Sequence, residues 1–100
     1  MKLISKKLRN SARNQDCTLR LACCNFDPET TVLAHLPVNQ GGMGMKSPDL
    51  FAVFACSSCH DALDGRKPYQ IDKDDLLRAL AETQMKWVEM GLIRVEGVKQ

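Results

Sequence analysis

Cys56-Ser57-Ser58-Cys59-His60 is the stretch that decides the fold of this chain, because it places two thiols one helical turn apart with a histidine directly after them. A second cysteine pair precedes it, formed by Cys17 and by either Cys23 or Cys24, and the other histidine, His35, lies between the two pairs. Two sulfurs at the start of a helix can turn toward one metal ion, and the helix amides then hydrogen-bond to them. The pattern predicts a structural Zn2+ bound by four thiolates.

The length of 100 residues predicts a single domain, 1–100, whose small core a metal ion would stabilise. The N-terminal residues lack the apolar core of a secretory signal, so we expect a cytoplasmic protein, where disulfides rarely persist. The five cysteines are therefore better explained as four metal ligands and one spare than as a disulfide framework, with buried free thiols as the alternative. No apolar run reaches the roughly 20 residues of a membrane span, so no membrane partner is expected.

Positive charge is concentrated at the N-terminus, although the net charge of the chain is only +2. Residues 1–20 hold six basic side chains and one acidic one, Asp16. Such an arm can neutralise phosphates, which favours DNA as a partner, and a solvated terminus is the alternative. The run from Gly41 to Lys46 offers amides and a cation to a phosphate backbone, or is simply a flexible hairpin connection. Arg66 and Lys67 are further candidate phosphate contacts.

The expected elements alternate between short strands and short helices. Residues 1–15 form a basic arm or short helix, and the last element is a helix over 72–91. In chain order the sequence predicts a helix over Lys6–Gln15, a knuckle over Cys17–Asn25, a strand over Thr30–Leu36, a loop over Asn39–Ser47, a buried strand over Leu50–Ala55 and a helix from Ser57 or Ser58 to about Gly65. Two thiolates before a hairpin and two at the following helix predict an α+β fold. Its core is a zinc-stapled treble-clef ββα unit with a C-terminal packing helix.

The helix over 72–91 has the clearest boundaries. Asp72 is a suitable N-cap, and Gly91 is a suitable stop. A stripe of mostly apolar residues at helical spacing predicts a core face, made by Leu76, Leu77, Leu80, Ala81, Gln84, Trp87 and Val88. A homodimer interface is the alternative place for Trp87.

The two histidines are candidates for catalysis. Consecutive helical side chains diverge by about 100°, so His60 faces away from the metal bound by Cys59 and toward the hairpin. His35 comes late in the first strand, and a ββα unit brings the two imidazoles near each other. One could act as a general base on water while the other holds a divalent ion on a phosphate oxygen. A structural role for either histidine is the alternative.

Four motifs carry a resemblance that covers about residues 8–95. They are Cys24-Asn25-x-x-Pro28-Glu29-Thr30, Leu33-Ala34-His35-Leu36, Lys46-x-x-Asp49-Leu50 and Ala55-Cys56-Ser57-x-Cys59-His60-Asp61. In these motifs the chain resembles a family of small nucleases encoded by lambdoid phages and prophages. That family is assigned to the HNH, or His-Me finger, superfamily, which includes endonuclease VII.

The resemblance implies a role for each motif residue. Cys24 rather than Cys23 is implied as the fourth metal ligand, beside Cys17, Cys56 and Cys59. His35 is implied as the general base, and His60 as a ligand of a catalytic Mg2+ or another divalent ion. The chain departs from the superfamily pattern twice. Ala34 stands where many members have a second metal ligand, and no Asn precedes the second cysteine pair to orient the base; Asp49, Asp61 or Asn39 are the candidates to replace it.

The sequence therefore predicts a metal-dependent endonuclease that hydrolyses DNA phosphodiester bonds. The resemblance places its origin in a phage or prophage. The alternative is a non-catalytic zinc module that binds DNA or a protein in phage recombination or regulation.

Overall fold

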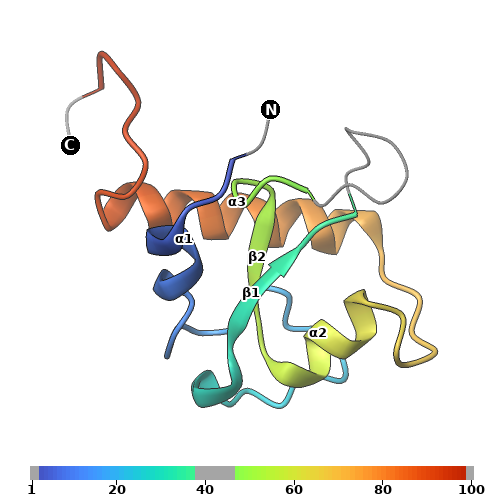
Figure 1. The fold of residues 1–100 in the computed structure, drawn as a ribbon. Helices are drawn as coiled ribbons and strands as arrows, with labels where there is room; N and C mark the ends of the chain where they lie inside the picture. The colour runs from blue at the N-terminus through green and yellow to red at the C-terminus, as the bar shows by residue number, and fades with distance from the viewer. Residues whose placement is uncertain (1–2, 38–46, 99–100) are drawn as a thin grey trace.

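The computed structural model describes residues 3–37 and 47–98 as a small α+β fold (Figure 1). In chain order its elements are α1 (Lys6–Ser11), a 3-10 turn η1 (Pro28–Thr30), β1 (Val32–His35), β2 (Ala52–Ala55), α2 (Ser57–Leu63) and α3 (Lys73–Glu89). Most of the predicted loop Asn39–Ser47, including Gly41, Gly42, Gly44 and Lys46, lies outside the described residues.

The described residues form one antiparallel hairpin, β1–β2, in which Val32 pairs with Ala55 and His35 with Ala52. Both α1 and α2 pack on the hairpin, and α3 packs along β2. Figure 1 shows α1 and α2 flanking the hairpin while α3 crosses behind it. All four residues of β2 are buried, as the apolar sequence of this strand predicted.

Two clusters of buried side chains fill the space on either side of the hairpin. Because side chains of a strand alternate between its faces, Val53 and Ala55 join the cluster that contains the buried cysteines. Phe54 joins the other cluster with Leu8 of α1 and Trp87 of α3. The rings of Phe54 and Trp87 meet edge to face, with their centroids 5.9 Å apart. Both faces of this short hairpin are therefore covered.

Trp87 is fully buried, and its indole nitrogen donates to Ser11 Oγ at 2.7 Å. The alternative of a homodimer interface for Trp87 was therefore wrong, because α1 covers the ring within the same chain. The predicted apolar stripe was also too wide, since Leu77 is 67% exposed. The narrower core line of α3 is Ala79, Thr83 and Trp87, each four residues from the next.

Several elements are shorter than predicted, for local reasons. The first helix ends at Ser11 rather than Gln15, and Asn14 then adopts a left-handed backbone with φ of 61°. The first strand begins at Val32 because Pro28–Thr30 forms a 3-10 turn, capped by the side chain of Asp27. The cap of α3 is Asp72, as predicted, and Gly91 follows its end with φ of 76°.

Candidate functional site

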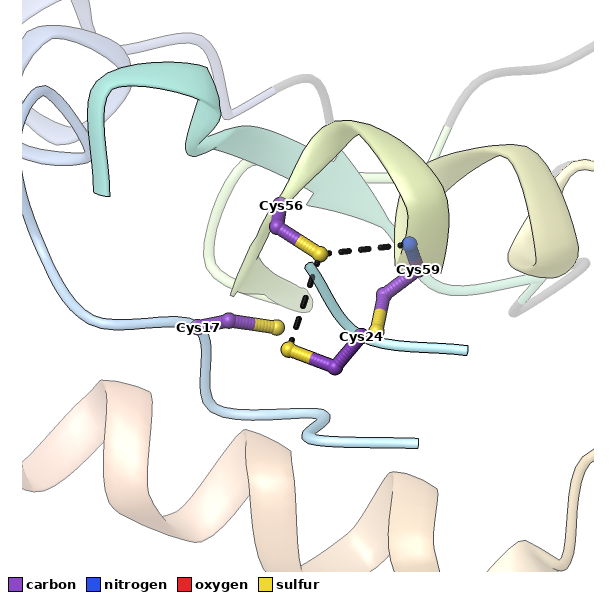
Figure 2. A group of neighbouring side chains, drawn as sticks. All are labelled: Cys17, Cys24, Cys56 and Cys59. Carbon is purple, nitrogen blue, oxygen red and sulfur yellow. Dashed lines mark hydrogen bonds between the residues drawn. The ribbon is translucent and has the colours of Figure 1, made fainter. Parts of the chain in front are cut away.

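Four cysteine sulfurs converge beside the start of α2 (Figure 2). The Sγ atoms of Cys17, Cys24, Cys56 and Cys59 all lie within 4.8 Å of one another. The sulfurs of Cys24 and Cys56 are 3.7 Å apart. A tetrahedral zinc with Zn–S bonds of about 2.3 Å separates its sulfurs by about 3.8 Å. The spacing of the cluster therefore fits a four-thiolate metal site. Cys23 stands outside it, with its sulfur 3.8 Å from the Ser58 carbonyl oxygen.

Backbone amides point at three of these sulfurs. Cys56 is the N-cap of α2, and its sulfur accepts a hydrogen bond from the Cys59 amide at 3.4 Å. The amides of Arg20 and Phe26 donate to Cys17 at 3.5 Å and to Cys24 at 3.4 Å. Arg20 and Phe26 both have left-handed backbones, with φ of 46° and 54°, which non-glycine residues adopt at a cost. The knuckle is thus folded so that its amides stabilise thiolates.

The pKa values of three of the thiols indicate that the cluster needs a bound cation before all of its sulfurs can ionise. Burial raises the pKa of Cys24 to about 11, and it raises that of Cys59 further. Burial opposes ionisation of Cys56 too, but hydrogen bonds from the backbone amides of Asn25 and Cys59 outweigh it and lower the pKa to about 7. A divalent ion would supply the charge that lets all four sulfurs ionise together. The donor set therefore suits Zn2+.

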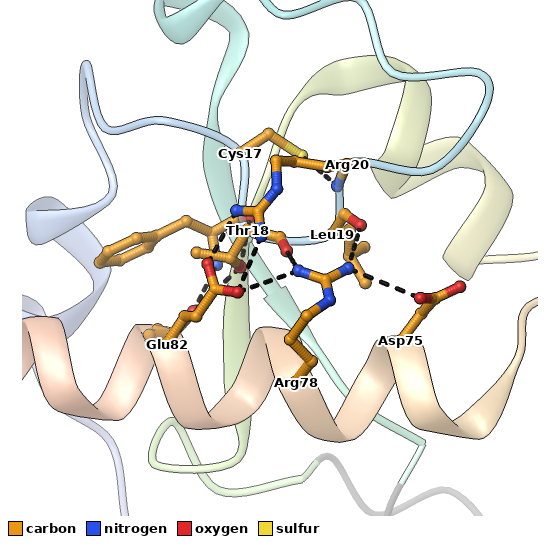
Figure 3. Close-up of polar contacts among 9 residues, drawn as sticks. Cys17, Thr18, Leu19, Arg20, Asp75, Arg78 and Glu82 are labelled. Atoms are coloured by element: carbon orange, nitrogen blue, oxygen red, sulfur yellow. Dashed lines mark hydrogen bonds and ion pairs between the residues drawn. The ribbon is translucent and has the colours of Figure 1, made fainter.

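A polar network fastens the cysteine knuckle to α3 (Figure 3). Arg78 donates to the carbonyl oxygens of Thr18 and Leu19 at 2.7 and 2.8 Å. Arg20 forms a bidentate ion pair with Glu82, at 2.7 and 2.8 Å. Hydrogen bonds from Arg20 are the main reason why the pKa of Glu82 falls to about 2. The packing helix therefore helps to position the loop that carries Cys17.

His35 lies on a different side of the hairpin from the cysteines. It shares a face of β1 with Leu33, and α1 covers that face. Its Nε2 atom lies 2.7 Å from Oδ1 of Asp49, a carboxylate whose side chain is only 1% exposed. Arg9 of α1 donates to the same carboxylate from Nε at 3.0 Å and from one terminal nitrogen at 3.2 Å, and the Ser5 amide donates at 2.7 Å.

Asp49 remains ionised in this environment. Burial alone would raise the pKa of Asp49, but hydrogen bonds from Arg9, His35 and the Ser5 amide lower it to about 2. A buried carboxylate on one nitrogen of an imidazole fixes the orientation and the tautomer of that ring. Of the two predicted replacements for the missing Asn that lie among the described residues, Asp49 is the one bonded to His35. Asn39 lies outside the described residues, and Asp61 pairs with Arg66 at 3.2 Å.

His60 reaches the same region from α2. Its Nε2 atom lies 3.1 Å from Oδ2 of Asp64, one turn further along the helix. His35, His60 and Asp64 all line one open cavity of about 600 Å³, to which α1, β1 and α2 contribute. The two histidines are thus brought to a shared cavity, while the cysteine cluster lies elsewhere. Asp64 was missed from the sequence, although its position four residues after His60 on a helix was a usable signal.

A family model described as "Putative nuclease YbcO" matches residues 6–92. This chain belongs to the YbcO family. Two relatives carry the name "Putative nuclease YbcO", one from Escherichia coli (strain K12) and one from Enterobacteria phage 82. Each is 42% identical over 93 residues, covering 87% of this chain and 96% of the relative. A solved structure described as "Structure of a putative bacteriophage protein from Escherichia coli str. K-12 substr. MG1655" is 39% identical, with a TM-score of 0.68. It covers 85% of this chain and 100% of that one.

The YbcO match confirms the phage-associated family, whose model and relatives carry the description "Putative nuclease". The two basic residues predicted as further phosphate contacts in this YbcO-family chain, Arg66 and Lys67, both lie on the surface. Arg66 is 62% exposed and pairs with Asp61 and Asp64, and Lys67 is exposed. Within the two described ranges, no helix has both the length and the apolar character needed to cross a bilayer.

Proposed function

We propose that this protein is a metal-dependent endonuclease of the HNH type that hydrolyses DNA phosphodiester bonds. The observation that carries the proposal is the shared cavity, which His35 enters from β1 and His60 from α2. The names of its YbcO relatives support a nuclease. Two imidazoles, the carboxylate of Asp64 and basic side chains in one cavity suit phosphodiester hydrolysis, and the buried Asp49 bonds to His35 from behind it.

His35 is the proposed general base. The ionised Asp49 accepts a hydrogen bond from Nε2–H of His35, which leaves the lone pair of the neutral ring on Nδ1. No described residue hydrogen-bonds to Nδ1, so this nitrogen is available to take a proton from water. Asp49 does the work that the missing Asn would do, because it holds the ring in one orientation.

His60 and Asp64 are the proposed ligands of the catalytic divalent ion. Ala34, the position of the usual second ligand, is fully buried and faces the cysteine cluster, so nothing can bind metal there. Asp64 offers a carboxylate oxygen next to His60 instead. A bound Mg2+ would polarise the scissile phosphate and stabilise the charge that develops on its oxygens.

The four cysteines are proposed to bind a structural Zn2+. Two ligands precede the hairpin and two stand at the start of α2, which is the order of a treble clef. Four thiolates leave zinc no open position for a substrate, so its role would be to stabilise the fold.

DNA cleavage by matched variants tests this proposal. Zinc-loaded protein is incubated with supercoiled, branched and single-stranded DNA and with Mg2+ or Mn2+. We expect His35→Ala to cleave at least about a hundredfold more slowly, since general bases contribute at least that much. Asp64→Asn should need more Mg2+, whereas Asp61→Asn, which keeps the cavity intact, should not.

Two results would contradict the nuclease. One is that no DNA substrate is cut, and the other is that His35→Ala cuts as fast as the parent protein. DNA binding that persists without any cleavage would instead support the non-catalytic zinc module.

A further inference from the structure

The α1 wall of the cavity has a chemistry that the proposed hydrolysis does not use. Arg9 and Asn10 of α1 line it, together with Arg13 from the turn that follows the helix. These residues face the cavity that contains His35 and His60. A ligand that fills this cavity would therefore lie beside two guanidinium groups.

The charges of this wall are not balanced. Arg9 gives two of its five N–H donors to Asp49 and its side chain is still 46% exposed, so donors remain for a ligand. Arg13 is exposed, and no residue in 3–37 or 47–98 forms a hydrogen bond or an ion pair with its side chain. The acidic residues nearby are already paired, Asp49 with His35 and Arg9, and Asp64 with His60 and Arg66. The uncompensated charge at this wall is positive, which favours an anionic ligand.

A buried hydroxyl marks the same cavity. Thr31 lines it and is only 5% exposed, yet its Oγ1 atom has no hydrogen-bond partner. Among the described residues it is the sole buried side-chain N or O atom in that condition. A buried hydroxyl without a partner is unfavourable, so native proteins rarely keep one. Thr31 therefore keeps an unused hydrogen-bonding group in the wall of this cavity.

The rest of the lining indicates which part of a nucleic acid is bound. No Phe, Tyr or Trp is found among the described residues that line the cavity, and its two imidazoles, His35 and His60, are the groups proposed to act on the phosphate, so no ring is left as a dedicated platform for a base. Its apolar members, such as Val32, Leu33 and Pro37, suit the faces of sugars. Guanidinium and hydroxyl groups bind phosphate oxygens, which are the same at every nucleotide.

We infer that the α1 wall is a sequence-independent binding site for the phosphodiester backbone of one nucleic acid strand. Arg9, beside His35, contacts the phosphate that reacts, and Arg13 contacts the next phosphate along the strand. This inference rests on the proposed function, and it adds how the substrate is held and that base sequence is not read.

Binding without cleavage tests it. Zinc-loaded full-length protein, with no Mg2+ or Mn2+ added, is titrated into short fluorescein-labelled oligonucleotides of different sequence, and anisotropy is followed between about 50 and 200 mM salt. We expect Arg13→Gln to weaken binding about tenfold for every sequence and to reduce the salt slope by about one. The matched control is Arg94→Gln, which removes the same charge from an exposed residue outside the cavity. It should change binding less than about twofold.

Equal losses in Arg13→Gln and Arg94→Gln would overturn the inference, because they would reflect overall charge rather than a site. A parent protein that binds no oligonucleotide, or that binds one sequence far better than others, would also overturn it. The same measurements distinguish a failure of this inference from a failure of the proposed nuclease function. If Arg13→Gln loses affinity but the parent never cleaves DNA, the binding wall stands and the nuclease does not. If His35→Ala binds normally and cleaves poorly, both stand.

Discussion

Asp49 is the residue on which the histidine part of the candidate site depends. It is nearly inaccessible to solvent, yet it receives hydrogen bonds from a strand, a helix and the N-terminal backbone. A buried carboxylate is unfavourable unless such partners are present, and removing its charge should release all three groups at once. Its contribution to stability should therefore depend on pH.

The expected effect of Asp49→Asn is a lower free energy of unfolding at pH 7. The folded pKa of Asp49 is about 2, below the ordinary value of 3.8, so ionisation favours the folded state. A difference of that size corresponds to roughly 2–3 kcal/mol. Because the folded pKa is depressed, this stability is fully present above about pH 4 and is lost as the pH falls toward 2. Urea unfolding of both proteins at several pH values measures it.

Asp61→Asn is the matched control for this prediction, since Asp61 is a surface carboxylate in an exposed ion pair with Arg66. Its loss should change stability by less than about 1 kcal/mol at any pH. Release in acid of any metal ion held by the cysteines would affect all three proteins alike, so the differences between them isolate the carboxylates. A gap between the parent protein and Asp49→Asn that stays constant from pH 7 to pH 2 would contradict the assignment.

At the scale of elements, α3 does more than cover the hairpin. Its buried residues, Ala79, Thr83 and Trp87, pack in the core. Arg78 and Glu82 extend from the helix to the cysteine knuckle (Figure 3). Thr83 adds a buried link, because its Oγ1 accepts from the Phe54 amide at 3.2 Å and lies 3.1 Å from Oγ1 of Thr18. The helix thus fixes both the hairpin and the loop before it.

Arg78→Met tests the link between α3 and the knuckle. The substitution keeps the aliphatic part of the side chain but removes the donors to two carbonyl oxygens, of Thr18 and Leu19. We expect a loss of about 1–3 kcal/mol in the free energy of unfolding, measured with urea. Lys86→Met on the same helix is the control, because Lys86 makes only a 3.8 Å surface pair with Glu89. Equal effects of the two substitutions would show that the network contributes nothing.

At the scale of the whole molecule, the cysteine cluster joins segments that are far apart in sequence. It brings the knuckle and α2 together inside the larger hydrophobic cluster. A domain of this size has a small core, so ion binding should supply much of its stability, on the order of 10 kcal/mol for a structural zinc. Metal removal should therefore unfold the protein rather than only inactivate it.

The comparison of Cys56→Ser with Cys23→Ser tests this. Cys56→Ser should bind less zinc and lose its circular dichroism signal on heating at a much lower temperature, as the parent should in a chelator. Cys23→Ser removes a thiol that lies outside the cluster, so its zinc content and melting temperature should remain close to those of the parent. If Cys56→Ser keeps the parent's melting temperature in a chelator, the four cysteines are not a structural metal site.

Much of the fold could be predicted from the sequence because it depends on local chemistry. The cap at Asp72, the glycine after α3 and the thiols at the start of α2 each act through backbone groups a few residues away. Element ends were less predictable. The 3-10 turn at Pro28–Thr30 displaced the start of β1, since turn and strand formation compete for the same backbone hydrogen bonds.

In the candidate site, too, some features follow from the sequence alone and others depend on the tertiary structure. The sequence by itself determined which thiols and histidines are present and that Cys-x-x-Cys-His begins a helix. Only the tertiary structure decided that Asp49 meets His35 and Arg9, that Asp64 joins His60 at the cavity, and that Trp87 is covered by α1. These contacts join residues on separate elements, or they depend on how several elements come together to line a cavity. Which residues become partners depends on how α1, the hairpin and α2 pack against one another. No short-range sequence pattern specifies that packing.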